Sequence, residues 1–260
     1  MKMTTLINAV IMAAMLAIPG VVFAQDEEQP PLYVAVDCMK STTGDYRDVE
    51  TDIWRPMHQE LVDQGKINSW ALYWVKFGDR SRCDFYTVTT YLGHEQLNAA
   101  AAFAEAFAVV HKGKDFMRAM ARTWASRQHV ATELWLAVDA TQIKQHRFAI
   151  VNMMHAKDPD AYERMETEVF KPGHQALVDG GHRSGWAMYE LVSPLGTTIP
   201  YNFSTVDFVD HLNPVPMAEA MLSAHPTRDL EAMHELLGLR DNVRSETWAL
   251  VSATGGSASE

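Results

Sequence analysis

Two glutamates that each lie close to a tryptophan in the sequence are candidates for acid–base chemistry. Glu133 and Trp135 lie two residues apart in VATELWLAV, and Glu246 and Trp248 repeat that spacing in VRSETWALV. Residues two apart on an extended strand project from the same face, so each carboxylate shares its face with an indole ring. A carboxylate that is removed from water there has a raised pKa, which suits a general base or a proton donor. Arg244 precedes Glu246 by two residues and would either hold an anionic substrate or form a structural ion pair with Glu246.

Two histidines occupy matching places in a second pair of segments, WRPMHQELVDQGKINSWALY and FKPGHQALVDGGHRSGWAMY. His58 and His174 each lie beside the apolar stripe of an expected helix, following a tyrosine and a glutamate at four-residue steps. One interpretation is a buried Tyr-Glu-His network for acid–base chemistry or ligand binding. The other, which we favour, is a core histidine whose hydrogen bonds satisfy the backbone around a proline break. Trp135 and Trp248 are the other ligand-binding candidates.

Cys38 and Cys83 are the two cysteines of the chain. In an oxidising compartment such a pair predicts a disulfide rather than a metal site, and the alternative is two free thiols. The sequence contains no His-Glu-x-x-His, no Cys-x-x-Cys, no glycine-rich phosphate loop and no Gly-x-Ser-x-Gly elbow. We therefore predict no metal site.

The elements that carry these residues occur twice in the chain. The two histidine segments match at ten of twenty positions with a constant offset of 116. The segment from Tyr86 resembles the one from Phe203 at an offset of 117, and the segment from His129 resembles the one from Asn242 at 113. An ordered match over about a hundred residues indicates an internal duplication.

Each copy has the same expected order of elements. The apolar segments LYVAVDCM and FAIVNMMH are typical of buried strands. A helix follows in each copy, and Pro56 and Pro172 should kink or restart it. Gly65 and Gly181 stand where a helix-ending glycine belongs. Two strands, a helical region and the Glu-x-Trp strand complete each copy.

The order β-α-β-β-α-β is that of the ferredoxin-like split βαβ unit. Two such units in one chain can cover each other's exposed sheet faces. The sequence therefore resembles the dimeric α/β-barrel superfamily in a tandem-repeat, single-chain form, which implies an α+β fold. In that fold the first and third strands are antiparallel neighbours. The resemblance thus places Cys38 and Cys83 at adjoining strand ends, within the reach of a disulfide.

These features divide the chain into six segments. The expected boundaries are a signal peptide at 1–24, a linker at 25–31, repeat 1 at 32–138, a linker at 139–147, repeat 2 at 148–252 and a disordered tail at 253–260.

Three functions are compatible with the resemblance. The first is binding of a small apolar or aromatic molecule in a cavity lined by Trp and Glu; if the protein is an enzyme, cofactor-independent proton transfer or oxygenation is the implied class. The second is a haem-binding or haem-handling protein, because some members of the superfamily bind or degrade haem through a helical histidine. His174 or His58 would be that ligand, and we expect no other cofactor. The third is a non-catalytic binding or assembly module.

The N-terminus and the net charge indicate where the protein acts. Lys2, the apolar run Leu6 to Leu16 and the residues VFA before Gln25 are typical of a secretory signal peptide, with an uncleaved membrane anchor as the alternative. Loss of Lys2 with the leader changes the formal net charge from −11 to −12. Such an acidic chain is a poor candidate for nucleic-acid binding. We expect a periplasmic or secreted protein, free of the membrane after cleavage, either a monomer with pseudo-twofold symmetry or a homo-oligomer.

Overall fold

The computed structural model describes residues 30–99, 102–227 and 229–255. The expected signal peptide lies outside these described residues, as do most of the first linker and most of the expected tail. The second linker falls between two long strands, one of which ends at Ala140 while the next begins at Phe148.

The strands of the described residues form one closed antiparallel barrel. Around the barrel they follow the order β1-β3-β2-β8-β5-β7-β6-β4. Their bounds are β1 (Leu32–Ser41), β2 (Ser69–Phe77), β3 (Phe85–Leu92), β4 (Arg127–Ala140), β5 (Phe148–Ala156), β6 (Gly185–Ser193), β7 (Phe203–Val209) and β8 (Arg240–Ala253).

The barrel consists of two equivalent halves. Strands β1 to β4 make one half and β5 to β8 the other, and each strand lies four places from its counterpart around the ring. Since every neighbouring pair is antiparallel, strands four places apart run in the same direction. The pseudo-twofold axis therefore runs along the barrel. The fourth strands are the longest, and each crosses into the other half: β8 pairs with β2, and β4 pairs with β6.

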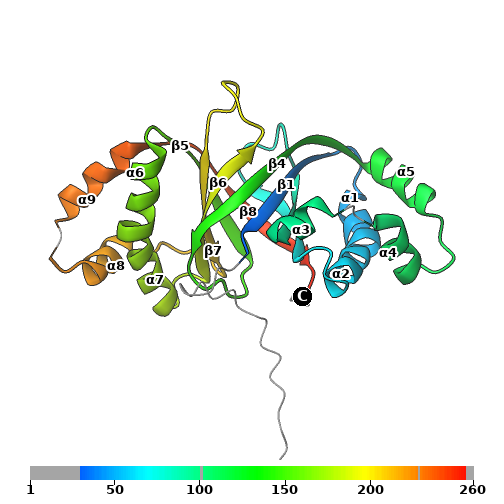
Figure 1. Cartoon of the computed structure of the whole chain (residues 1–260), viewed down its shortest axis with the longest axis horizontal. Coiled ribbons are helices and arrows are strands. Elements are labelled where there is room, and N and C mark those ends of the chain that lie inside the picture. The colour runs from blue at the N-terminus through cyan, green and yellow to red at the C-terminus, as the bar shows by residue number, and fades with distance from the viewer. Residues whose placement is uncertain (1–29, 100–101, 228, 256–260) are drawn as a thin grey trace, which may run out of the picture.

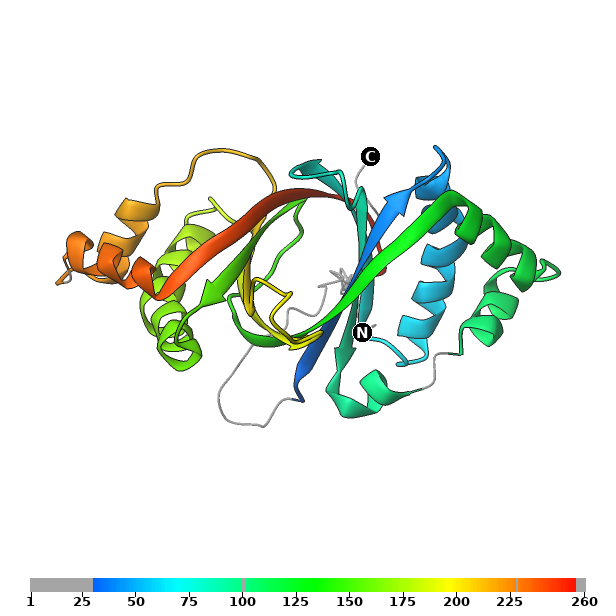
Figure 2. The same cartoon turned by 90° about the horizontal axis from the view of Figure 1, so that it is seen from above.

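Helices cover the outside of the barrel on two opposite sides (Figures 1 and 2). The first half carries α1 (Tyr46–Val49), the π-helical turn η1 (Glu50–Trp54), α2 (Arg55–Asp63), α3 (Gly93–Asn98), α4 (Phe103–Val110) and α5 (Phe116–Ser126). The second half carries α6 (Pro159–Arg164), the π-helical turn η2 (Met165–Phe170), α7 (Lys171–Asp179), α8 (Met217–Ala224), α9 (Leu230–Leu236) and the 3₁₀ turn η3 (Leu237–Leu239).

Apolar cores therefore lie both inside the barrel and between its wall and each helix layer. Trp70 and Trp186 are completely or almost completely buried under the helices of their own halves. The interior core contains Trp135 and Trp248 from the two fourth strands. Burial of large aromatic side chains on both faces of the wall contributes much of the hydrophobic stabilisation.

The proline and glycine predictions for the first helix are confirmed. In both halves the chain passes through a π-helical turn and then restarts as an α-helix with a proline in its first turn. Gly65 has φ +67 and Gly181 has φ +71, the left-handed conformation that ends a helix. In the first half, the N–H of Lys66 reaches back to the carbonyl of Leu61 at 2.9 Å and satisfies that helix end.

The structural correspondence between the halves differs from the sequence alignment at two strands. Phe85 pairs with Met39, and Phe203 pairs with Met154, each just beyond a β-bulge. Phe85 and Phe203 are therefore equivalent at an offset of 118, where the sequence pattern had suggested that Tyr86 corresponds to Phe203. The reason is that the bulges follow Cys38 and Met153, so the first strands correspond at an offset of 115 instead of 116. The third strands, which pair with them, must then change their correspondence by one residue as well, so that the same side chains face inward.

No helix within the described ranges combines the length and the apolar character that crossing a membrane requires.

Candidate functional site

The two Glu-x-Trp pairs lie inside the barrel, as strand alternation predicts. Trp135 and Trp248 belong to the interior core, and Glu246 is almost completely buried. Glu133 is partly buried. Because β4 and β8 are equivalent strands on opposite sides of the ring, the pairs occupy equivalent places, one from each half.

A cavity opens between the two indole rings. It provides about 70 Å³ for the centres of water molecules, and its surface is almost entirely apolar. Its lining residues come from all eight strands: Val34, Val36, Tyr73, Val88, Trp135, Ala149, Val151, Met153, Tyr189, Ser204, Val206, Phe208 and Trp248. Neither glutamate belongs to this lining. Glu246 is instead linked to it through Trp248, whose Nε1–H donates to Oε2 of Glu246 at 2.9 Å.

Glu246 is held by groups from both halves. The hydroxyl of Tyr86, on β3, donates to the same Oε2 at 3.3 Å, and the Tyr86 ring stacks on Trp248 with ring centroids 4.0 Å apart. Oε1 of Glu246 lies 3.7 Å from Nε of Arg244. Both hydrogen-bond donors thus meet Oε2 of this buried carboxyl group, while Oε1 faces the Arg244 cation without a hydrogen bond.

Glu133 has a corresponding partner from the opposite half. The hydroxyl of Tyr201 donates to its Oε1, and the Tyr201 ring is nearly parallel to that of Trp135, 6.0 Å away. Tyr201 lies just before β7, whereas Tyr86 lies within β3. Two tyrosines from non-equivalent positions thus perform equivalent tasks, each reaching across to the other half's carboxylate.

Arg244 lies between the two Tyr-Glu pairs. Its guanidinium is 6.0 Å from the centre of the Tyr201 ring, while its Nε is paired with Glu246. Burial acts to lower the pKa of Arg244, but the surrounding phenols and carboxylates outweigh it and raise the pKa. The arrangement contains the ion pair with Glu246 that the sequence offered as one alternative. A catalytic role for Glu133, Glu246 and Arg244 stays a prediction.

Both phenols act as hydrogen-bond donors to their carboxylates. Burial raises the pKa of Tyr86 and of Tyr201, and the adjacent carboxylates raise both further. A phenol whose pKa is raised remains protonated at neutral pH. In this cluster the tyrosine hydroxyls therefore donate and the glutamate oxygens accept.

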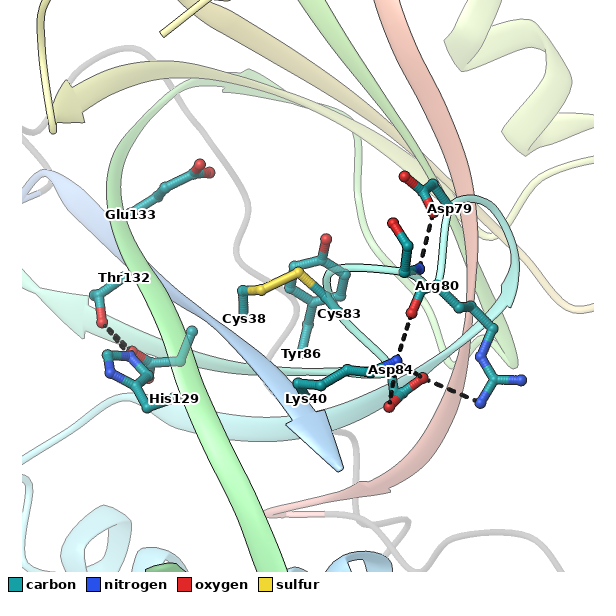
Figure 3. Close-up of a disulfide and its surroundings, with 12 residues drawn as sticks. Cys38, Lys40, Asp79, Arg80, Cys83, Asp84, Tyr86, His129, Thr132 and Glu133 are labelled. Carbon is teal, nitrogen blue, oxygen red and sulfur yellow. Dashed lines mark hydrogen bonds and ion pairs between the residues drawn. A yellow bond between two sulfur atoms is a disulfide. The ribbon is translucent and has the colours of Figure 1, made fainter. Parts of the chain in front are cut away.

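The Cys38–Cys83 disulfide is present, with a Cα–Cα distance of 5.5 Å, and Cys38 pairs with Tyr86 across the β1–β3 ladder. Both cysteines are part of the interior core. Figure 3 shows the disulfide beside the ring of Tyr86, with Glu133 and Thr132 leaving β4 on opposite sides. In the second half, Met153 takes the place of Cys38 beside β7. The expected covalent link is thus confirmed.

His58 and His174 lie on the other side of the barrel wall, under the helices. His58 stacks on Trp70 with ring centroids 4.9 Å apart, and His174 stacks on Trp186 at 4.8 Å. Burial lowers the pKa of His58 to about 3. Burial also lowers the pKa of His174 well below its ordinary value, and the charge of Arg183 beside it acts in the same direction. The two rings are therefore neutral and face away from the cavity.

The glutamates near these histidines are paired with arginine instead. Oε1 of Glu50 lies 3.9 Å from Nε of Arg127, and Oε1 of Glu166 lies 3.4 Å from Nε of Arg240. Burial raises the pKa of each carboxyl to about 7, although the arginine charge acts in the opposite direction. The Tyr-Glu-His networks considered from the sequence are thus formed only in their Tyr-Glu part, with an arginine in place of the histidine beside each glutamate.

The described residues do not fit a haem inside the barrel. The cavity lining contains no histidine. At about 10–15 Å³ per water, its volume holds only a few water molecules. The described part of the chain also contains no group of three or more His, Cys, Asp or Glu side chains that could hold a metal ion.

Sequence reasoning missed three tyrosines of the interior core, Tyr73, Tyr86 and Tyr201, and one histidine that contacts it, His146. Tyr86 was hidden by the alignment with Phe203, whereas its structural counterpart is Ser204. Tyr201 lies outside the strands, so alternation gave no direction for its side chain. His146 lies between the repeats, where the composition indicated only a linker. The signal that could have found Tyr73 was its place in β2, two residues after Ala71 on the inward face.

No known family model and no curated protein matches this chain. Solved structures do. A presumed monooxygenase from Lactobacillus acidophilus is 13% identical with a TM-score of 0.50, over 87% of this chain and 96% of its own. An anthrone oxidase-like protein is 13% identical with a TM-score of 0.46, over 87% and 93% of the two chains. A presumed chlorite dismutase is 10% identical with a TM-score of 0.46, over 85% and 95%.

Identities this low establish the fold alone. The chain has the dimeric α/β-barrel fold. It builds that barrel from two ferredoxin-like repeats within a single polypeptide.

Proposed function

We propose that this protein is exported and binds one small apolar or aromatic molecule inside its barrel. The observation that carries the proposal is the apolar cavity between Trp135 and Trp248. The face of an aromatic ring packs favourably on another ring at centroid distances of about 4.5–7 Å. A flat ligand in the cavity would contact both indoles, because both belong to its lining.

The chemistry of the lining selects the class of ligand. The polar groups of the lining are few and consist mainly of the hydroxyls of Tyr73, Tyr189 and Ser204. An apolar cavity remains dry when empty and takes apolar guests, because water gains no hydrogen bonds there. Ligands that enter already charged are disfavoured, because the apolar lining itself provides no opposite charge to offset the desolvation of an ion.

Export is supported by the expected signal peptide and by the disulfide. Disulfides persist in oxidising compartments and are rare in the cytosol. The acidic net charge is compatible with a soluble binding protein that does not bind nucleic acid.

Binding of 4-nitrotoluene tests the proposal, because this neutral, flat molecule should quench tryptophan fluorescence when it lies between the indoles. We expect saturable binding at one site per chain. Val151→Phe places a ring in the cavity and should abolish binding, whereas Val192→Phe changes an exposed position on β6 and should leave binding intact. A cooperative thermal melting transition would establish that each variant is folded. Absence of saturable binding to the wild type, or equal binding by a folded Val151→Phe variant, would contradict the proposal.

A further inference from the structure

A tyrosine and a histidine that the sequence did not single out form a hydrogen-bonded pair at the wall of the cavity. The hydroxyl of Tyr73, on β2, lies 2.9 Å from Nε2 of His146, in the segment that joins the two repeats. The two rings are nearly parallel, with an interplanar angle of 9°. Tyr73 lines the cavity, and His146 packs against Phe208, another lining residue, with ring centroids 4.6 Å apart.

The backbone fixes the protonation of the imidazole. Nδ1 of His146 lies 3.1 Å from the carbonyl oxygen of Lys144. A carbonyl oxygen can only accept a hydrogen bond, so Nδ1 carries the proton. In the neutral ring Nε2 is then an acceptor, and the Tyr73 hydroxyl donates to it. The direction of the chain is thus defined: Tyr73 donates to His146, and His146 donates to Lys144.

The ionisation tendencies of the two groups agree with this neutral chain. Burial lowers the pKa of His146, and burial raises the pKa of Tyr73. The groups that pack on the imidazole are the Tyr73 phenol from β2 and the Phe208 ring from β7, neither of which is charged. The neighbouring Arg147 is engaged with Asp210 at 2.9 Å.

Among the described residues, only the first half of the barrel has this pair. Tyr189, on β6, corresponds to Tyr73 at the offset of 116 and lines the same cavity. Within the described residues, its hydroxyl has no hydrogen-bond partner, and burial raises its pKa. A tyrosine thus occurs at equivalent places in both halves of the cavity wall, but only the Tyr73 hydroxyl is hydrogen-bonded to a histidine. Packing alone would account for the ring in both halves, but it does not account for the histidine.

We propose that Tyr73 and His146 form a proton relay for a ligand that carries one weakly acidic hydroxyl, of the phenol or enol type, on an otherwise apolar body. This inference rests on the proposed function, because the ligand occupies the cavity described above. A phenol oxygen that donates its own proton still has lone pairs with which to accept another. Tyr73 can therefore accept a hydrogen bond from the ligand while it donates to His146.

The transfer is balanced without an oxidant or a reductant. The O–H bond of the ligand breaks and its proton moves to the oxygen of Tyr73, while the proton of Tyr73 moves to Nε2 of His146. The ligand becomes a phenolate or enolate, and His146 becomes an imidazolium whose charge stabilises it. Return of the proton to a carbon atom of the ligand instead of its oxygen completes a keto–enol tautomerisation, a general acid–base reaction.

The ionisation of bound 4-nitrophenol provides the test, because its phenol and phenolate forms absorb at different wavelengths. In the wild type, the pH midpoint of ionisation of the bound probe should lie about one pH unit or more below that in Tyr73→Phe, a tenfold change in the equilibrium. His146→Gln should behave like Tyr73→Phe, and it keeps the test available if the tyrosine variant does not fold. Tyr33→Phe is the matched control, because the Tyr33 hydroxyl also lies beside a histidine, 3.3 Å from Nδ1 of His94, but Tyr33 is not part of the cavity lining; this variant should give the wild-type midpoint.

Binding of 4-nitrotoluene separates the two proposals. If 4-nitrotoluene binds the wild type, but 4-nitrophenol does not bind or ionises at the same pH in wild type, Tyr73→Phe and Tyr33→Phe, the relay is wrong and the binding function stands. If neither probe binds in the cavity, both proposals are wrong. A lowered midpoint that depends on Tyr73 and His146, and not on Tyr33, supports the relay.

Discussion

The hydroxyl of Tyr86, in the first half of the barrel, donates a hydrogen bond to the carboxylate of Glu246, in the second half. Its ring stacks on Trp248, so one side chain contributes both a polar and an aromatic contact across the barrel. Tyr201 and Glu133 make the reciprocal contact. The two halves are thus joined through the interior as well as through the strand pairing of the wall.

Replacement of Tyr86 by Phe should lower the free energy of unfolding by about 1–2 kcal/mol, because it leaves the aromatic stacking in place and removes one donor from a buried carboxylate. Urea unfolding measures the change. Tyr91→Phe on the same strand is the control and should change stability by only a few tenths of a kcal/mol. Equal effects of the two substitutions would mean that the contact with Glu246 contributes nothing.

The disulfide should stabilise the first half substantially. It closes a loop with a sequence separation of 45, for which the chain-entropy model gives about 4 kcal/mol. The double variant Cys38→Ala/Cys83→Ala should unfold at a correspondingly lower urea concentration, and reduction of the wild type should reproduce the effect. Two reactive thiols in the denatured, non-reduced wild type would show that the link does not form in solution.

Gly78, in the turn between β2 and β3, should tolerate substitution less well than Gly196, between β6 and β7. Both have positive φ values, +150 and +138, so alanine is strained at either position. At Gly78 the added Cβ would also lie 2.8 Å from Cγ of Glu246, whereas at Gly196 it meets nothing within 4 Å. Thermal melting of Gly78→Ala and Gly196→Ala compares them. A larger loss for Gly196→Ala would contradict the close packing of Gly78 on Glu246.

The buried carboxyls of Glu50 and Glu166 should make the protein less stable as the pH rises. Their folded-state pKa values of about 7 exceed the ordinary value of 4.5, so the folded state binds protons more tightly than the unfolded state between these values. Their contribution is therefore fully present below pH 4.5 and is lost as the pH rises through about 7. Glutamine mimics the protonated acid, so its stability does not change as Glu50 would ionise. The free energy of unfolding of Glu50→Gln should therefore rise relative to that of the wild type by up to about 3 kcal/mol between pH 4.5 and 8.

Urea unfolding at several pH values measures this difference and cancels the titration of other groups. Glu168→Gln, at an exposed position two residues after the buried Glu166, is the control, and its free energy of unfolding should change with pH as that of the wild type does. A constant difference between Glu50→Gln and the wild type across this range would show that Glu50 is ionised throughout.

The sequence predicted the fold well because the duplication provided two readings of each element. Each feature that one repeat suggested recurs at the same place in the other repeat. This holds for the helix-ending glycines Gly65 and Gly181, for the two prolines and for the two Glu-x-Trp strands. The inward direction of Glu133 and Glu246 followed from strand alternation alone, which is a strictly local property. The pairing of Cys38 with Cys83 followed from strand order, once the fold had been inferred.

The partners within the interior could not be predicted in the same way. A β-bulge after Cys38 and another after Met153 shift the alignment by one residue, and a shift of one residue reverses the face of every side chain that follows. Tyr201 and His146 lie outside the strands, where no periodicity fixes the direction of a side chain. Their contacts depend on how the two halves meet, which neither repeat specifies alone.

The position of β8 in the ring has a consequence for folding. It is the last strand of the chain, yet it lies between β2 and β5, and its pairing joins Ala71 to Ala253. Until β8 is in place, β2 and β5 each present an unpaired edge, and the aromatic interior is open to water. Such distant contacts form slowly, because loop-closure entropy opposes them before any pairing can compensate. The barrel therefore cannot close until β8 has left the ribosome.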